Sequence, residues 1–112
     1  MIATARGALW RLPDGRIERV SASDATLRAA GSRPLVCHAP AVAARLGLED
    51  LPARDLLELY AFVRPAIFCL PTPRGLCAAL DLPTPATPEE EVASLPEVAR
   101  DLLDELDDMA AL

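Results

Sequence analysis

The chain has 112 residues, a net charge of −6 and 52% hydrophobic residues, while only 4% are aromatic. This length supports one globular domain that buries roughly two-thirds of its unfolded surface without metal or disulfide staples. The negative charge argues against a domain that binds DNA tightly through its overall field. No apolar run reaches the roughly 18 residues of a membrane span, and the first ten residues lack an apolar signal core, so we expect a cytoplasmic protein with no membrane partner.

The charge is unevenly distributed along the chain. Residues 1–75 carry ten arginines against seven acids, a balance of +3, whereas residues 76–112 carry one arginine against ten acids, a balance of −9. An acidic segment of this kind is typical of a surface that faces water, an arginine-rich partner or the rest of a longer polypeptide. The basic first part could contact phosphate, so weak binding of single-stranded DNA stays open.

A β-hairpin is expected near the start of the chain. Two short strands, Ala8–Leu12 and Arg16–Val20, flank Pro13-Asp14-Gly15, and Asp-Gly is a strong hairpin signal. Trp10 lies on the first of these strands and is expected to anchor the core.

A short helix and a buried strand should follow the hairpin. Ser23 is placed to cap a helix over Asp24–Ala30, which Gly31 would end. The apolar run Leu35–His38 predicts a strand. We expect this strand to join the hairpin in a mixed sheet of at least three strands, covered by the helices that follow.

Three helices are expected between residues 40 and 80. Each has a clear boundary signal: a first-turn proline, a left-handed glycine, a terminating proline or a hydroxyl cap. The helices and their signals are Pro40–Leu46 with Gly47 after it, Ala53–Val63 with Pro65 after it, and a helix capped by Thr72 that begins at Pro73.

Residues 83–88 read as a proline-rich connector, and residues 89–112 as acidic C-terminal helices. Thr87 and Glu90 have the spacing of a capping box, and Ser94 followed by Pro96 repeats the same pattern. The sequence thus predicts a single α/β domain over residues 1–112, or α+β in a stricter scheme. Its sheet is small and mixed with an N-terminal hairpin, and about five helices cover it.

The cysteine count suggests a reducing compartment. Cys37, Cys69 and Cys77 are an odd number in apolar surroundings without metal-ligand spacing, so we expect buried free thiols. A small enzyme or metal protein that uses Cys37, His38 and Cys69 stays an alternative. We expect no cofactor and no resident metal.

The run from Pro34 to Leu82 contains four short motifs in order: Leu35-Val36-Cys37-His38-Ala39-Pro40-Ala41-Val42-Ala43, Asp55-Leu56-Leu57-Glu58-Leu59, Arg64-Pro65, and Leu76-Cys77-Ala78-Ala79-Leu80. The run resembles the second half of a DnaQ-like (DEDD-type) exonuclease domain. There a strand leads into a His-Asn-Ala-x-Phe-Asp turn, and an Asp-Thr-Leu helix, a proline and a Leu-x-x-Leu helix follow. It is similar in particular to the amino-terminal region of alphaproteobacterial DinG-type ATP-dependent DNA helicases, where a reduced exonuclease-like module precedes the helicase body. The resemblance implies a reduced ribonuclease H-like fold.

The sequence departs from the nuclease pattern at the acids that hold two metal ions. Gly7–Leu12, taken as the first strand, contains no Asp-x-Glu, and Ala43 stands where the second motif has its aspartate. His38 is the only histidine, so the final His-x-x-x-x-Asp motif has no counterpart. The resemblance therefore implies that this chain by itself is not an enzyme, and no P-loop motif is present for ATP.

These observations predict a non-catalytic accessory domain of a DNA repair helicase, which docks on the helicase body in cis or guides DNA. Candidate vestigial or partner-contacting positions are His38, Asp55, Arg64 and Arg74; no catalytic or metal-binding residue is predicted. His38 at a strand end is more often structural, and Asp55 fits a helix-start acid. The alternative is a stand-alone protein-interaction module that uses the amphipathic C-terminal helix, with Leu103 or Leu106 presented to a partner.

Overall fold

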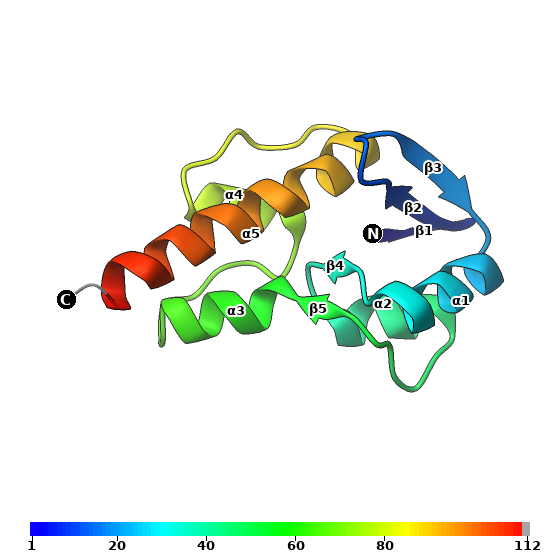
Figure 1. Cartoon of the computed structure of the whole chain (residues 1–112), viewed down its shortest axis with the longest axis horizontal. Helices are drawn as coiled ribbons and strands as arrows, with labels where there is room; N and C mark the ends of the chain where they lie inside the picture. Colours follow the sequence, from blue (N-terminus) through cyan, green and yellow to red (C-terminus); the bar gives the residue numbers. More distant parts are fainter. Residues whose placement is uncertain (111–112) are drawn as a thin grey trace.

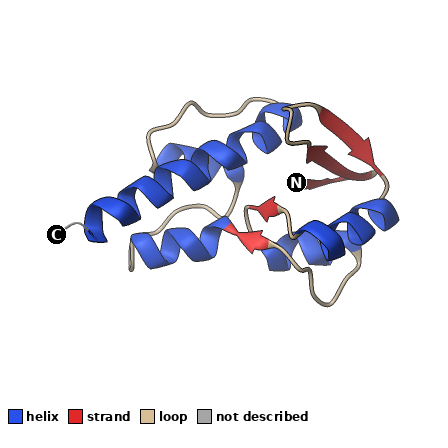
Figure 2. Ribbon diagram, viewed as in Figure 1, coloured by secondary structure: helices blue, strands red, loops and turns tan. Residues whose placement is uncertain are grey.

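The computed structural model describes residues 1–110, which form two small sheets and five helices (Figure 1). The elements are β1 (Ile2–Thr4), β2 (Gly7–Arg11), β3 (Ile17–Val20), α1 (Ala22–Ser32), β4 (Leu35–Val36), α2 (Ala39–Leu46), β5 (Arg54–Asp55), α3 (Leu56–Val63), α4 (Pro73–Ala79) and α5 (Pro88–Ala110). Figure 2 shows the antiparallel sheet and α1 at one end of the molecule, α3 and the end of α5 at the other, and β4 and β5 between them. The expected α/β class with an N-terminal hairpin and five helices is confirmed.

The predicted hairpin is formed by β2 and β3, which pair antiparallel. The turn at Pro13-Asp14-Gly15 is closed by a hydrogen bond from the Leu12 N–H to the Arg16 carbonyl oxygen (2.7 Å). Trp10 on β2 is 9% exposed and lies in the core, as expected.

The first strand of the sheet, β1, was not predicted. It pairs antiparallel with β2 and places Ile2 opposite Leu9. Gly7 begins β2 with φ +145°, and a Cβ at this position would collide with the Val20 carbonyl oxygen. Glycine therefore allows β2 to approach the end of β3 closely.

Helix α1 is longer than predicted at both ends. Its cap is Ser21, whose hydroxyl oxygen accepts the Asp24 N–H (3.1 Å), so the expectation that Ser23 caps the helix was wrong. The predicted stop at Gly31 was also wrong, because the helix continues until Arg33 takes the left-handed conformation with φ 48°.

The strand expected over Leu35–His38 is shorter and does not join the hairpin sheet. β4 pairs in parallel with β5, with Leu35 opposite Arg54 and Val36 opposite Asp55. The prediction of one shared sheet was therefore wrong. The partner of β4 is β5, a polar two-residue strand that the sequence does not indicate, because neither residue favours a strand. The Met1 ammonium donates to the Leu35 carbonyl oxygen (2.7 Å), so β4 still lies beside the start of β1.

The middle helices follow their predicted boundary signals. α2 ends at Gly47, which has φ 76°, and Thr72 caps α4 by accepting a backbone N–H in its first turn. α3 begins at Leu56 rather than Ala53, because Asp55 belongs to β5 and caps the helix with its side chain.

The connector over residues 83–87 has no helix or strand, and Pro88 already begins α5. The predicted capping box is present at this start. The Thr87 hydroxyl oxygen accepts the Glu90 N–H (3.1 Å), and the Glu90 carboxylate accepts the Ala86 N–H (2.8 Å).

α5 is one helix of 23 residues, where two were expected. The second start predicted at Ser94 was wrong: its hydroxyl donates to the Glu91 carbonyl oxygen (2.7 Å), and Pro96 lies inside the helix. A proline at this position removes one helical hydrogen bond. The apolar stripe from Val92 to Leu102 packs against the core on both sides of the proline and keeps the helix continuous. Within residues 1–110, no helix is both long enough and apolar enough to cross a lipid bilayer.

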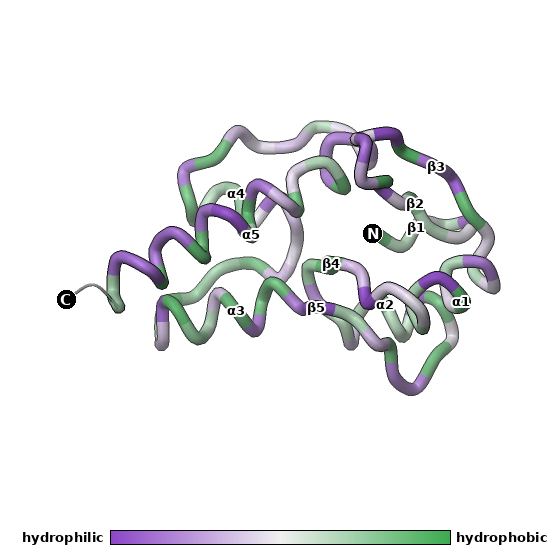
Figure 3. The backbone as a smooth tube through the Cα atoms, viewed as in Figure 1, coloured by the Kyte–Doolittle hydropathy of each residue, from purple (hydrophilic) through white to green (hydrophobic). Residues whose placement is uncertain are grey.

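The core consists of two clusters. One lies between α5 and the helices α3 and α4, and its largest fully buried members are Leu9, Leu56, Tyr60, Leu76, Leu95 and Leu102. The other lies among the antiparallel sheet, α1 and α2, and includes Met1, Trp10, Ala25, Ala29, Val36, Ala43 and Leu51. Figure 3 shows hydrophobic and hydrophilic positions alternating along α5, as expected for a helix with one buried face.

Candidate functional site

Two of the predicted residues, His38 and Asp55, meet at the centre of the molecule. They lie at the carboxyl ends of β4 and β5, and parallel strands bring those ends to the same edge. The His38 Nδ1 atom is 3.8 Å from the Asp55 Oδ2 atom. This is the one place within residues 1–110 where two of the four predicted positions come within ion-pair distance.

Asp55 connects the starts of two helices. Its Oδ1 accepts the Glu58 N–H (3.0 Å) in the first turn of α3, and its Oδ2 accepts the Ala39 N–H (2.8 Å) in the first turn of α2. The side chain is only 5% exposed. The predicted role of a helix-start acid is therefore confirmed, and both carboxylate oxygens are engaged by backbone groups.

The cysteines provide no reactive thiolate beside this pair. Burial, with a smaller contribution from the Asp55 carboxylate, raises the pKa of the Cys37 thiol to about 12. Cys77 is also buried, while Cys69 is half-buried and its pKa is raised by desolvation. Since the thiolate is the nucleophile and metal ligand, Cys37 stays unreactive at neutral pH. Among residues 1–110, no group of three or more His, Cys, Asp or Glu side chains is placed to hold a metal ion.

The segments that the resemblance compares with the nuclease metal-binding motifs carry no acids at the motif positions. The first strand is β1 (Ile2–Thr4) and not the predicted Gly7–Leu12, but neither segment contains an aspartate or glutamate. Ala43 is 3% exposed and packs in the second core cluster. Helix α2 contains no aspartate or glutamate, so no neighbouring acid on this helix can take the place of the aspartate expected at Ala43.

Arg64 is partly buried and held in place by hydrogen bonds to α4 and α5. Its Nε and Nη2 donate to the Glu105 carboxylate (3.0 Å each), and its Nη1 donates to the Ala79 carbonyl oxygen (2.9 Å). These bonds raise the pKa of Arg64 and lower the pKa of Glu105. Three of the five N–H donors of Arg64 thus join the end of α3 to α4 and α5. The buried Tyr60 hydroxyl has no hydrogen-bond partner within residues 1–110, although it helps to raise the pKa of Arg64.

Arg74 has the opposite setting. It is exposed in the first turn of α4 and forms no ion pair within residues 1–110. Of the two predicted arginines, Arg74 is therefore the one whose charge is free to meet a partner.

Sequence reasoning missed an exposed apolar surface at the end of α3 and in the segment that leads to α4. We call it the apolar end patch, and its members are Phe62 (69% exposed), Ile67 (57%), Phe68 (81%) and Leu70 (59%). The signal was the run Ala66–Leu70, an apolar stretch between Pro65 and Pro71 that is too short for a helix. Ala66 has φ 66°, a strained value for a residue with a Cβ, and it turns the chain at the start of this run.

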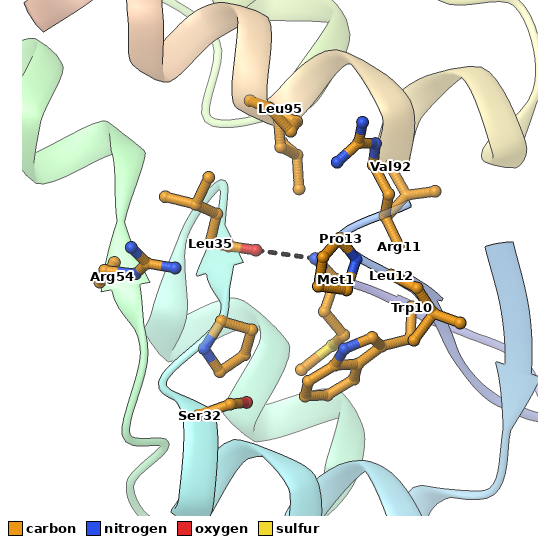
Figure 4. A pocket seen from close by; sticks show the side chains of 12 residues that line it. Met1, Trp10, Arg11, Leu12, Pro13, Ser32, Leu35, Arg54, Val92 and Leu95 are labelled. Atoms are coloured by element: carbon orange, nitrogen blue, oxygen red, sulfur yellow. Dashed lines mark hydrogen bonds between the residues drawn. The ribbon is translucent and has the colours of Figure 1, made fainter. Parts of the chain in front are cut away.

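A cavity of about 290 Å³ lies between the antiparallel sheet, β4, β5 and α5 (Figure 4). Its lining combines apolar side chains with two arginines, Arg11 and Arg54, and contains no acid. Figure 4 shows the two arginines on opposite sides of the cavity, with the hydrogen bond from Met1 to Leu35 between them. No sequence motif predicts this cavity, because its walls come from segments far apart in the chain.

Comparisons of the chain with protein-family models, with curated proteins and with solved structures found no match. The functional interpretation therefore depends on the geometry of these residues and on the resemblance of the Pro34–Leu82 run.

Proposed function

We propose that this chain is a non-catalytic accessory domain of an ATP-dependent DNA helicase that acts in DNA repair, and that it docks on the helicase body. The proposal includes a cytoplasmic setting and a reduced ribonuclease H-like arrangement. Two structural features support it. β4 and β5 are parallel and each leads into a helix, which is the strand–turn–helix order of the resemblance. Asp55 caps the start of α3, which matches the position of the aspartate in the Asp-Thr-Leu helix of the resemblance.

The observation that carries the docking function is the apolar end patch. Its four large side chains are each more than half exposed within nine consecutive residues. Exposed apolar side chains that occur singly are ordinary, whereas a contiguous group marks an interaction surface. We assign this surface to the contact with the helicase body.

The charges beside the patch define the partner's chemistry. The Arg64–Glu105 ion pair brings the C-terminal half of α5 against the end of α3. The remaining acids of this half of α5 form no ion pair within residues 1–110; they are Asp101, Asp104, Asp107 and Asp108. An apolar surface next to a helix that carries unpaired carboxylates is complementary to an amphipathic helix with arginine or lysine along its apolar face. We propose that the helicase body presents such a helix.

The proposal is tested by titrating the helicase body, expressed as a separate chain, with the 112-residue chain in a calorimeter. Burying a phenylalanine side chain contributes about 1.5–3 kcal/mol, so replacing Phe62 and Phe68 together by serine should weaken binding roughly 100-fold or more. The matched control is Leu27→Ser, which removes a side chain that is 73% exposed on α1. Equal weakening by the control, or binding that the double variant leaves intact, contradicts the assignment.

A second candidate is a stand-alone protein-interaction module that uses α5. Leu103 is 50% exposed and Met109 is 48% exposed, while Leu106 is half-buried against the core. This arrangement leaves Leu103 free for a partner, although the main part of the apolar stripe is covered. Size-exclusion chromatography with mass measurement separates the two candidates for the isolated chain: a dimer that Leu103→Ser dissociates supports the α5 module, and a strict monomer rules out a helix-mediated dimer.

A further inference from the structure

The cavity in Figure 4 carries an excess of positive charge. Four of the eleven arginines form ion pairs within residues 1–110: Arg16, Arg19, Arg28 and Arg64. Arg11 and Arg54 are among the arginines that form no ion pair within residues 1–110. Both line this cavity, which has no acidic residue in its walls. The charge remains uncompensated although the whole chain is acidic.

The cavity also offers hydrogen-bond donors without acceptors. Arg54 Nε donates to the Arg33 carbonyl oxygen (2.9 Å), which fixes the side chain and leaves its terminal nitrogens unbonded within residues 1–110. The Arg11 guanidinium and the Trp10 indole N–H likewise donate to no atom of this part of the chain. The Leu35 carbonyl oxygen at the centre already accepts a hydrogen bond from the Met1 amino group. The cavity thus has free hydrogen-bond donors on its arginines, while its central acceptor is already used. This combination favours an anionic ligand.

Apart from Ser32, the remaining lining residues are apolar, and they suit an apolar ring better than a second charged group. They include Trp10, Leu12, Pro13, Pro34, Leu35 and Leu95. The volume of about 290 Å³ lies at the small end of ligand cavities, so the cavity suits one small ligand and not a long chain.

We propose that this cavity binds one nucleoside monophosphate group, with the phosphate beside Arg54 and the base against the apolar walls, while Arg11 on the opposite side adds to the positive charge of the cavity. The group has two possible sources, a free mononucleotide or one nucleotide of single-stranded DNA. If the source is DNA, the inference deepens the proposed helicase function and gives the domain a point at which it holds the strand. If the source is a free mononucleotide, the cavity is independent of that function.

Trp10 is the only tryptophan of the chain, so its fluorescence reports on the cavity directly. The 112-residue chain is titrated with deoxyadenosine monophosphate, with deoxyadenosine, with inorganic phosphate and with a short single-stranded oligonucleotide. We expect saturable quenching by the monophosphate or by the oligonucleotide, and at least roughly ten-fold weaker binding of deoxyadenosine and of phosphate alone, since each lacks half of the contacts.

Two charge-matched variants complete the test. Arg54→Ser should weaken binding roughly ten-fold or more, whereas Arg100→Ser, which removes an exposed arginine of α5 outside the cavity, should leave it unchanged. Quenching by the monophosphate identifies the free nucleotide as sufficient, and quenching by the oligonucleotide alone identifies DNA as the source. The inference is overturned if no nucleotide quenches, if phosphate alone binds as well as the monophosphate, or if Arg54→Ser has no effect. These outcomes do not depend on the Phe62 and Phe68 variants, so this site and the docking function can fail separately.

Discussion

The buried Met1 amino group predicts how the free energy of unfolding changes with pH. Its burial lowers its pKa from 8.0 to about 5, because charge is disfavoured away from water. Between these values the unfolded chain holds a proton that the folded chain has released. The free energy of unfolding should therefore rise as the pH is raised from 5 to 8, and this group should contribute no pH dependence above or below that window. A pKa difference of this size corresponds to about 4 kcal/mol in total.

The assay is urea denaturation, followed by circular dichroism at pH 5, 6, 7 and 8 and constant ionic strength. The control is a chain with Gly-Ser added before Met1. Its peptide N–H can still donate to the Leu35 carbonyl oxygen but cannot titrate, so most of the slope should disappear. A free energy of unfolding that stays constant or falls from pH 5 to pH 8, or an equal slope in the extended chain, would show that the Met1 amino group does not titrate in this way.

Four further results are expected. Leu102→Ala should lower the free energy of unfolding by about 2–5 kcal/mol, because Leu102 is fully buried, and the half-exposed neighbour Leu103→Ala should change it by less than about 0.5 kcal/mol in the same urea titration. Asp55→Ala should cost at least about 1 kcal/mol in thermal or urea unfolding, because two helix starts lose their acceptor. Alkylation followed by mass spectrometry should label Cys69 before Cys37 at pH 8, and labelling of Cys37 in the folded chain would contradict its raised pKa. The isolated chain should not degrade labelled single-stranded DNA in magnesium or manganese, and degradation would show that the missing acids are replaced.

Local chemistry made several boundaries predictable. The turn at Pro13-Asp14-Gly15, the caps at Thr72 and Thr87 and the helix stop at Gly47 depend on the residue at the boundary and its nearest neighbours. The same reasoning placed Asp55 at a helix start. The cap of α1 was misplaced by two residues: Ser21 and not Ser23 accepts the Asp24 N–H, and Ser23 lies inside the helix.

Pairing between distant segments could not be predicted. β1 has three residues and β5 has two, and each is a strand only because another segment lies beside it. The second start expected at Ser94 failed for a related reason, since packing of the stripe from Val92 to Leu102 overrides the local proline signal.

The candidate site was predictable only in part. His38 and Asp55 do come together, but the partner of Arg64 is Glu105, which lies 41 residues further along the chain, and nothing in the local sequence indicates it. The apolar end patch was missed because an apolar run is usually read as core, and exposure of Phe68 depends on how α3 and α4 are connected. The cavity beside Arg54 was missed because its walls meet only after folding.

Reading the coding sequence beyond the codon for Leu112 decides whether this domain serves a helicase body. We expect the frame to continue into a Gly-x-x-x-x-Gly-Lys-Ser/Thr motif of an ATP-binding helicase core. A stop codon directly after Leu112, or a continuing frame without such a motif, would contradict it.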